Sequence, residues 1–296
     1  MTDQIKLLSN KMNVSGAEKQ LSDFIVKMLS DQGFCPKVDN LGNVILKNEN
    51  FENSKLMICT PLDNPGFLTL YSEKSKAYLS YTDKKDENIK NTKEVIDQEG
   101  EIYKAKSSKE YPDYVCVTKN AHLIGEPFRI PSVICEKDGK ISGKFICRYA
   151  LQSVLLDLAG LTRTHNISLC FTTGFHTPSK SENCLARKHN PENMILLGFT
   201  EAKESHCILL AKDGKSFSDR NLMKIALLSA EKCKIGLIKK AQDAPITKAE
   251  TIAVPGGIKV LSLALPCQNP GKNDEATQSK RLLELKNILN EIILSF

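Results

Sequence analysis

Strand-length apolar runs alternate with helix-length amphipathic segments at both ends of the chain, but not in its middle. Near the start, Ser15 and Glu18 have capping-box spacing and precede a helical apolar pattern over residues 21–29. Strands are predicted at 44–46 and 56–59, and the second is continuously apolar, as in a strand buried on both faces. This alternation predicts an α/β fold with a mixed sheet covered by helices.

The same alternation returns after residue 143. Helices are predicted at 149–161, 219–233 and 282–293, and strands at 167–173, 194–199, 208–211, 235–238 and 258–265. We assign Asp274 and Glu275 to the start of the last helix. Both ends of the chain are therefore expected to build one sheet.

The middle of the chain has a different character. Its β-like pieces are short, and polar stretches without a helical period separate them, at 67–71, 77–81, 114–117 and 132–135. This pattern predicts a small β-rich, barrel-like domain over 66–142, with an exposed polar loop within 83–110. The α/β domain would then consist of residues 1–65 and 143–296.

Composition excludes several classes of protein. The net charge is +6, but the lysines are interleaved with acids, Trp is absent and aromatics are 6%, so we expect no nucleic-acid partner. No apolar run approaches the roughly 20 residues of a membrane span, and the first ten residues do not resemble a secretory signal. We therefore expect a cytoplasmic protein without a membrane partner, with its ten cysteines reduced.

Ligands of open α/β sheets gather at the carboxyl ends of the strands. The segments that follow the predicted strands are 60–66, 174–176, 198–200 and 266–270. Residues 143–148 lead into the helix predicted at 149. These segments carry the candidate site.

Several of these segments carry a resemblance to a known family. Asp39-Asn40-Leu41-Gly42-Asn43, Gly143-Lys144, Arg148 and the strand 260–266 occur in the family's order. Over nearly its whole length, the chain resembles the tetrahedral (TET-type) dinuclear metallo-aminopeptidases, which include glutamyl and deblocking aminopeptidases and cellulase-M-like peptidases. The resemblance implies a zinc-aminopeptidase-like fold with an inserted β domain, and self-association as dimers or dodecamers.

The family's chemistry uses two divalent metals roughly 3.5–4 Å apart, which polarise the peptide carbonyl and activate a bridging water. By resemblance, the aspartate that orients the ligands is retained as Asp63. The general-base glutamate falls on Phe175. The metal-ligand positions fall on Pro61, Ile146, His176, Gly198 and Gln268.

These side chains offer too few donors for two metals, and Phe175 cannot accept a proton. We therefore expect no cofactor and an aminopeptidase homologue that is catalytically inactive. Such a chain would act as a scaffold, as an assembly partner of itself or of an active paralogue, or as a peptide-binding module.

Three alternatives remain open. Asp63, Cys147 and His176 could hold a single zinc, with Gln268 or water as a further ligand. The same three residues could form a thiol hydrolase in which His176 activates Cys147. An active metallo-aminopeptidase with displaced ligands is the third, since a register slip would bring Glu201 toward the position of Gly198.

Overall fold

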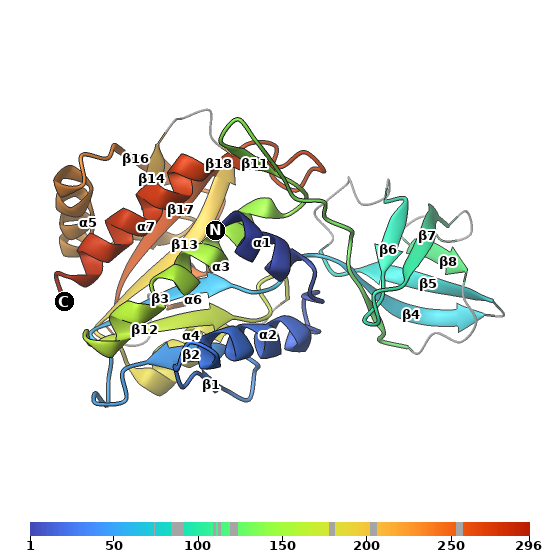
Figure 1. Cartoon of the computed structure of the whole chain (residues 1–296), viewed down its shortest axis with the longest axis horizontal. Helices are drawn as coiled ribbons and strands as arrows, with labels where there is room; N and C mark the ends of the chain where they lie inside the picture. Colours follow the sequence, from blue (N-terminus) through green and yellow to red (C-terminus); the bar gives the residue numbers. More distant parts are fainter. Residues whose placement is uncertain are drawn as a thin grey trace.

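The computed structural model describes residues 1–73, 75–83, 92–108, 111, 114–118, 124–177, 181–201, 206–252 and 257–296. A large α/β body and a smaller β body lie side by side (Figure 1). Of the polar loop expected within 83–110, residues 84–91 and 109–110 lie outside the described residues. None of the helices in the described part is both long and apolar enough to cross a membrane.

The α/β body contains a mixed sheet in the order β1-β2-β12-β3-β13-β17-β14-β15, with β16 also paired to β14. Four neighbouring strands, β12, β3, β13 and β17, are parallel, so their carboxyl ends meet at one edge of the sheet. The strands are β1 (Lys37–Val38), β2 (Val44–Lys47), β3 (Leu56–Pro61), β12 (Ile167–Thr172), β13 (Asn193–Glu201), β14 (Cys207–Asp213), β15 (Ser216–Phe217), β16 (Leu237–Gln242) and β17 (Lys259–Cys267).

Helices cover both faces of this sheet. Alternate strand residues point to opposite faces, so Ile58 packs in the core beneath α3, α5 and α7, whereas Met57 packs with α4 and α6. The helices are α1 (Thr2–Ser9), α2 (Lys19–Ser30), α3 (Ile146–Asp157), the 3-10 helix η2 (Ala159–Arg163), α4 (Ser181–His189), α5 (Arg220–Lys232), α6 (Ala249–Ile252) and α7 (Ser279–Ile293). The predicted α/β fold with a helix-covered mixed sheet is confirmed.

The smaller body is a six-stranded antiparallel sheet in the order β6-β7-β8-β5-β4-β9. A bridge between Ile96 and Arg129 joins its two edges, which nearly closes the sheet into a barrel. The expected barrel-like sheet is therefore present. Its strands are β4 (Phe67–Glu73), β5 (Lys76–Tyr81), β6 (Glu94–Ile96), β7 (Ile102–Ser107), β8 (Tyr114–Thr118) and β9 (Pro127–Phe128).

A three-stranded sheet lies outside both of these sheets. The hairpin of β10 (Cys135–Lys137) and β11 (Lys140–Ser142) pairs with β18 (Ala276–Gln278), which lies near the end of the chain. The strand predicted at 132–135 is wrong, because only Cys135 of that segment is in a strand. The assignment of Glu275 to the last helix is also wrong, since Glu275 precedes β18 and α7 begins at Ser279.

Candidate functional site

The candidate site lies at the edge where the four parallel strands end. Asp63 follows β3, Gly174 and the two residues after it follow β12, and Gln268 follows β17. Helix α3, which begins at Ile146, contacts β17 and β18, and the backbone N–H of Cys147 in its first turn donates to Glu275. Segments that are far apart in sequence therefore meet at one edge, as predicted from the strand ends.

Asp63 is fully buried and holds the loop after β12 in place. Its Oδ1 accepts a hydrogen bond from the backbone N–H of Phe175 (2.9 Å), and its Oδ2 accepts from the backbone N–H of His176 (3.1 Å). The hydroxyl of Ser15 donates to the same Oδ2 at 2.5 Å. Both carboxylate oxygens are thus engaged by protein donors.

The capping box expected before the helical pattern at residues 21–29 is wrong. α2 begins at Lys19, and no side chain caps its first turn. Ser15 instead donates to Asp63, and the Oε1 of Glu18 accepts from the backbone N–H of Gly174 at 2.8 Å. Burial, followed by the nearby charge of Asp63, raises the pKa of Glu18. Tertiary partners at the candidate site have replaced the local capping partners.

Arg148 occupies the centre of the site. Its guanidinium carbon lies 4.4 Å from the ring centroid of Phe175 and 5.2 Å from that of Phe199. Burial lowers the pKa of Arg148, and the negative charge of Asp63 opposes this effect. Its Nε has no hydrogen-bond partner among the described residues. A buried cation in contact with two aromatic rings therefore lies beside His176, one of the predicted metal-ligand positions.

The imidazole of His176 is engaged at both nitrogens. Nδ1 lies 2.8 Å from Oδ2 of Asp83, and Nε2 lies 3.2 Å from Nη2 of Arg148. Because an arginine can only donate, the lone pair of Nε2 accepts from Arg148, and Nδ1–H donates to Asp83. This arrangement leaves no free lone pair on His176 for a metal or for the proton of a thiol.

The other predicted metal-ligand positions place few donors at the edge. The side chains of Pro61 and Ile146 are buried and carry no donor atom. Gly198 has no side chain, and Gln268 is exposed. Phe175, at the predicted base position, stacks on Arg148. These residues do not fit a centre of two adjacent divalent metals, which needs several anionic or imidazole ligands.

The surroundings of Gly198 are closed by a neighbouring loop. A Cβ atom on Gly198 would lie 3.1 Å from the backbone oxygen of Ile246 and 3.1 Å from Cγ2 of Thr247. The carboxylate of Asp213, which is buried, accepts from the backbone N–H groups of Ile246 and Thr247 and from the Thr247 hydroxyl. Asp213 therefore fixes the segment that fills the space beside Gly198.

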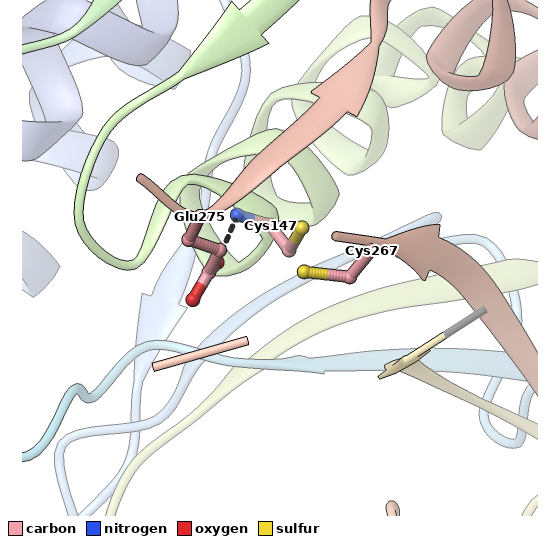
Figure 2. A group of neighbouring side chains, drawn as sticks. All are labelled: Cys147, Cys267 and Glu275. Carbon is pink, nitrogen blue, oxygen red and sulfur yellow. Dashed lines mark hydrogen bonds between the residues drawn. The ribbon is translucent and has the colours of Figure 1, made fainter. Parts of the chain in front are cut away.

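Cys147, Cys267 and Glu275 form a buried cluster at the same edge (Figure 2). One ligand atom of each residue lies within 4.8 Å of the others. The Oε1 of Glu275 accepts from the backbone N–H of Cys147 (2.8 Å), and Oε2 accepts from the backbone N–H of Gly271 (2.7 Å). Burial, then the contact with Cys267, raises the pKa of the Cys147 thiol well above its ordinary value.

The contacts of Asp63, Cys147 and His176 do not form the thiol relay considered from the sequence. The side chain of Asp63 bonds to the backbone of His176 rather than to its imidazole. The thiol of Cys147 lies beside Cys267, and its raised pKa disfavours the thiolate that a nucleophile needs. Among the described residues, the groups with metal-ligand spacing are the Cys147 cluster and Asp97, Glu99 and Glu126 of the barrel; neither includes Asp63 or His176.

Four buried residues near the site were not predicted as site residues from the sequence. Cys267 and Glu275 lie on either side of the turn that joins β17 to β18, and Asp213 ends β14. Glu182 lies in the first turn of α4, where it accepts from the Thr172 hydroxyl at 2.7 Å. Acidic residues are common in the first turn of a helix, where they are usually exposed. The sequence around Glu182 therefore does not indicate that its side chain is buried. Only Cys267 had a usable sequence signal, because it lies at the end of a strand that was predicted to be buried.

Solved structures match this chain over nearly its whole length, whereas no protein-family model and no curated protein matches it. PhTET1-12s, described as a dodecamer in the asymmetric unit, aligns with a TM-score of 0.86 at 15% identity and covers 99% of this chain and 98% of its own. A TET aminopeptidase from a marine sediment Thaumarchaeota archaeon aligns at 0.86 and 14% identity, covering 98% and 95%. The Pyrococcus horikoshii TET1 peptidase aligns at 0.81 and 16% identity, covering 98% of each chain.

These observations define an α/β architecture with a β-barrel body inserted between two parts of the main sheet. The chain has the fold of the TET aminopeptidases. At 14–16% identity, what the chains share is the fold.

Proposed function

We propose that this chain is a non-hydrolysing member of the TET-type aminopeptidase family that serves as a scaffold or assembly subunit. The observation that carries the proposal is the donor set at the strand ends. Pro61, Ile146 and Gly198 contribute no ligand atom, and the lone pair of His176 is engaged by Arg148. A pair of adjacent divalent cations would repel each other with little anionic charge to offset the repulsion.

The loss of a general base supports the same proposal. A positioned base contributes a factor of about 10²–10⁴ to a hydrolytic rate. Phe175 has no group that can accept a proton, and its ring packs against the guanidinium of Arg148. Backbone N–H groups of the loop that carries Phe175 donate to both oxygens of Asp63, so the retained aspartate binds the protein backbone.

Assembly is the function that the fold favours once hydrolysis is set aside. PhTET1-12s is a dodecamer, and the Pyrococcus horikoshii TET1 peptidase forms a tetrahedron or an octahedral shell. The present chain matches both along nearly its entire length. We propose that it self-associates or joins particles of an active paralogue, and that peptides are candidate ligands of the edge around Arg148.

Two measurements test this proposal together. Purified protein is assayed against a panel of aminoacyl-p-nitroanilides with added cobalt or zinc, and its molar mass is measured by light scattering. We expect no turnover above the buffer control and a mass of several chains. Metal-dependent turnover that Asp63→Asn abolishes would contradict the non-hydrolysing role. A monomer that also fails to co-purify with a paralogue would contradict the assembly role.

A further inference from the structure

We propose that Cys147, Cys267 and Glu275 bind a single zinc ion that ties the first turn of α3 to the end of β17 and the start of β18. The sequence offered Cys147 as a zinc ligand together with Asp63 and His176, whereas the structure groups it with Cys267 and Glu275. The site would be structural, because all three residues are fully buried. This zinc site is independent of the proposed function, which rests on the residues at the implied two-metal positions.

The three ligand atoms already have nearly the spacing that zinc requires. They lie within 4.8 Å of one another. Figure 2 shows the sulfur of Cys267 directed toward Cys147, with the carboxylate of Glu275 on the other side of Cys147. Zinc binds cysteine sulfur at about 2.3 Å and carboxylate oxygen at about 2.0–2.2 Å, so the donors need to close by on the order of 1 Å. Thiolates and a carboxylate suit zinc better than calcium or magnesium.

The fold holds these donors from three directions. Cys147 is on α3, Cys267 is the last residue of β17, and Glu275 immediately precedes β18. Glu275 is oriented by the N–H groups of Cys147 and Gly271, and each of its oxygens has a further lone pair. Outer hydrogen bonds of this kind commonly fix the orientation of a metal ligand. The second carboxylate oxygen or a water would complete four-coordination.

Charge and protons balance without an oxidant. Zinc binding breaks two S–H bonds, forms two Zn–S bonds and releases two protons to solvent; any proton carried by Glu275 is released as well. The bound cluster, with one dication and three anionic ligands, carries one net negative charge. Arg148 interacts electrostatically with both Cys147 and Glu275, so its cation offsets that charge in the buried site.

Cys147 and Cys267 could instead form a disulfide bond. The mass of the native chain distinguishes zinc binding from disulfide formation. Protein is expressed with zinc, purified under mild reduction without chelator, and measured by native mass spectrometry and elemental analysis. We expect about one zinc per chain, with the mass raised by one zinc less two protons. A metal-free chain lighter by two hydrogen atoms, the mark of an oxidised disulfide, or an unmodified chain would overturn the proposal.

Cobalt expression places the metal on named residues. Cobalt-grown protein should show the near-ultraviolet charge-transfer band of thiolate ligation, and Cys147→Ser and Cys267→Ser should each remove it. Cys59→Ser is the matched control, since Cys59 and Cys170 form another buried thiol pair on neighbouring strands, and it should keep the band. A band that survives both test substitutions would place the metal elsewhere. The mass measurement decides the proposal if a serine variant does not fold.

Discussion

Two buried carboxylates at the same sheet edge, Asp63 and Glu275, perform similar structural tasks in different surroundings. Asp63 binds the N–H groups of the loop after β12 and lies within electrostatic reach of Arg148. Glu275 binds N–H groups of α3 and of the turn after β17, and it lies beside two thiols. The acids at this edge therefore orient loops, and only the region of Glu275 also gathers soft metal donors.

The largest expected effect comes from removing the acceptor at Asp63. Asp63→Ala leaves the buried Ser15 hydroxyl and two partly buried N–H groups without their acceptor and should lower the free energy of unfolding by about 3–5 kcal/mol. Asp63→Asn, which keeps one acceptor oxygen, should lose less. Urea denaturation measures both. Equal, small losses in the two variants would show that Asp63 does not anchor the loop.

A carboxylate introduced at Gly198, within β13, should not create a metal ligand, because the neighbouring loop leaves no room for a side chain. Gly198→Ala should destabilise the protein by about 1–3 kcal/mol, because its Cβ meets the backbone oxygen of Ile246. Gly198→Asp should lose more, since it adds a buried charge next to that oxygen, and it should gain no peptidase activity. Thermal denaturation and the nitroanilide assay check both points. A stable Gly198→Asp variant that hydrolyses substrate with added metal would refute the closed site.

A smaller effect is expected from the partner of Asp63 on the N-terminal segment. Ser15→Ala removes one hydrogen bond to a buried carboxylate and should lower the free energy of unfolding by about 1.5 kcal/mol. Ser9→Ala is a control of the same chemistry, because its hydroxyl donates to the backbone oxygen of Lys6 within one helix. Chemical denaturation of both compares them. If Ser9→Ala lowered the free energy of unfolding more than Ser15→Ala, the hydrogen bond from Ser15 to Asp63 would not have the stabilising role assigned to it.

The smallest effect concerns Glu182 and depends on pH. Burial raises the pKa of Glu182 above its ordinary value of 4.5, so the folded state holds its proton more tightly than the unfolded state does. Stability therefore falls as pH rises through the folded pKa. Glu182→Gln keeps an acceptor for Thr172 but cannot ionise, so it should be more stable than wild type at pH 7, with the gain vanishing near pH 4.5. A deficit at pH 7 that persists on acidification would contradict this expectation.

Several regular elements of the fold were predictable because their signals are local, although α1, α4 and α6 were not predicted. The helix predicted at 219–233 is α5, and the Asp219 carboxylate caps it by accepting from the N–H groups of Asn221 and Leu222. The buried strand at 56–59 is the core of β3. Apolar periodicity and caps act within a few residues, so the sequence displays them directly.

The contacts of the candidate site were less predictable because they join distant segments. Ser15 and Glu18 carry a local capping signal, yet they bind Asp63 and Gly174 once the chain is folded. Glu275 looks like the first turn of a helix, but pairing of β18 with β11 draws it into the core. Strand-end reasoning predicted which segments meet at one edge of the sheet, whereas the partners at that edge depend on tertiary packing.

Anomalous diffraction at the zinc or cobalt edge tests the central claim most directly. Crystals of protein grown with the metal are measured, and peaks are located relative to the edge formed by β3, β12 and β17. The account predicts no pair of metal peaks beside Asp63 and His176, and one peak among Cys147, Cys267 and Glu275. Two peaks about 3.5–4 Å apart beside Asp63 would contradict it, since that spacing is the one used by two-metal hydrolases.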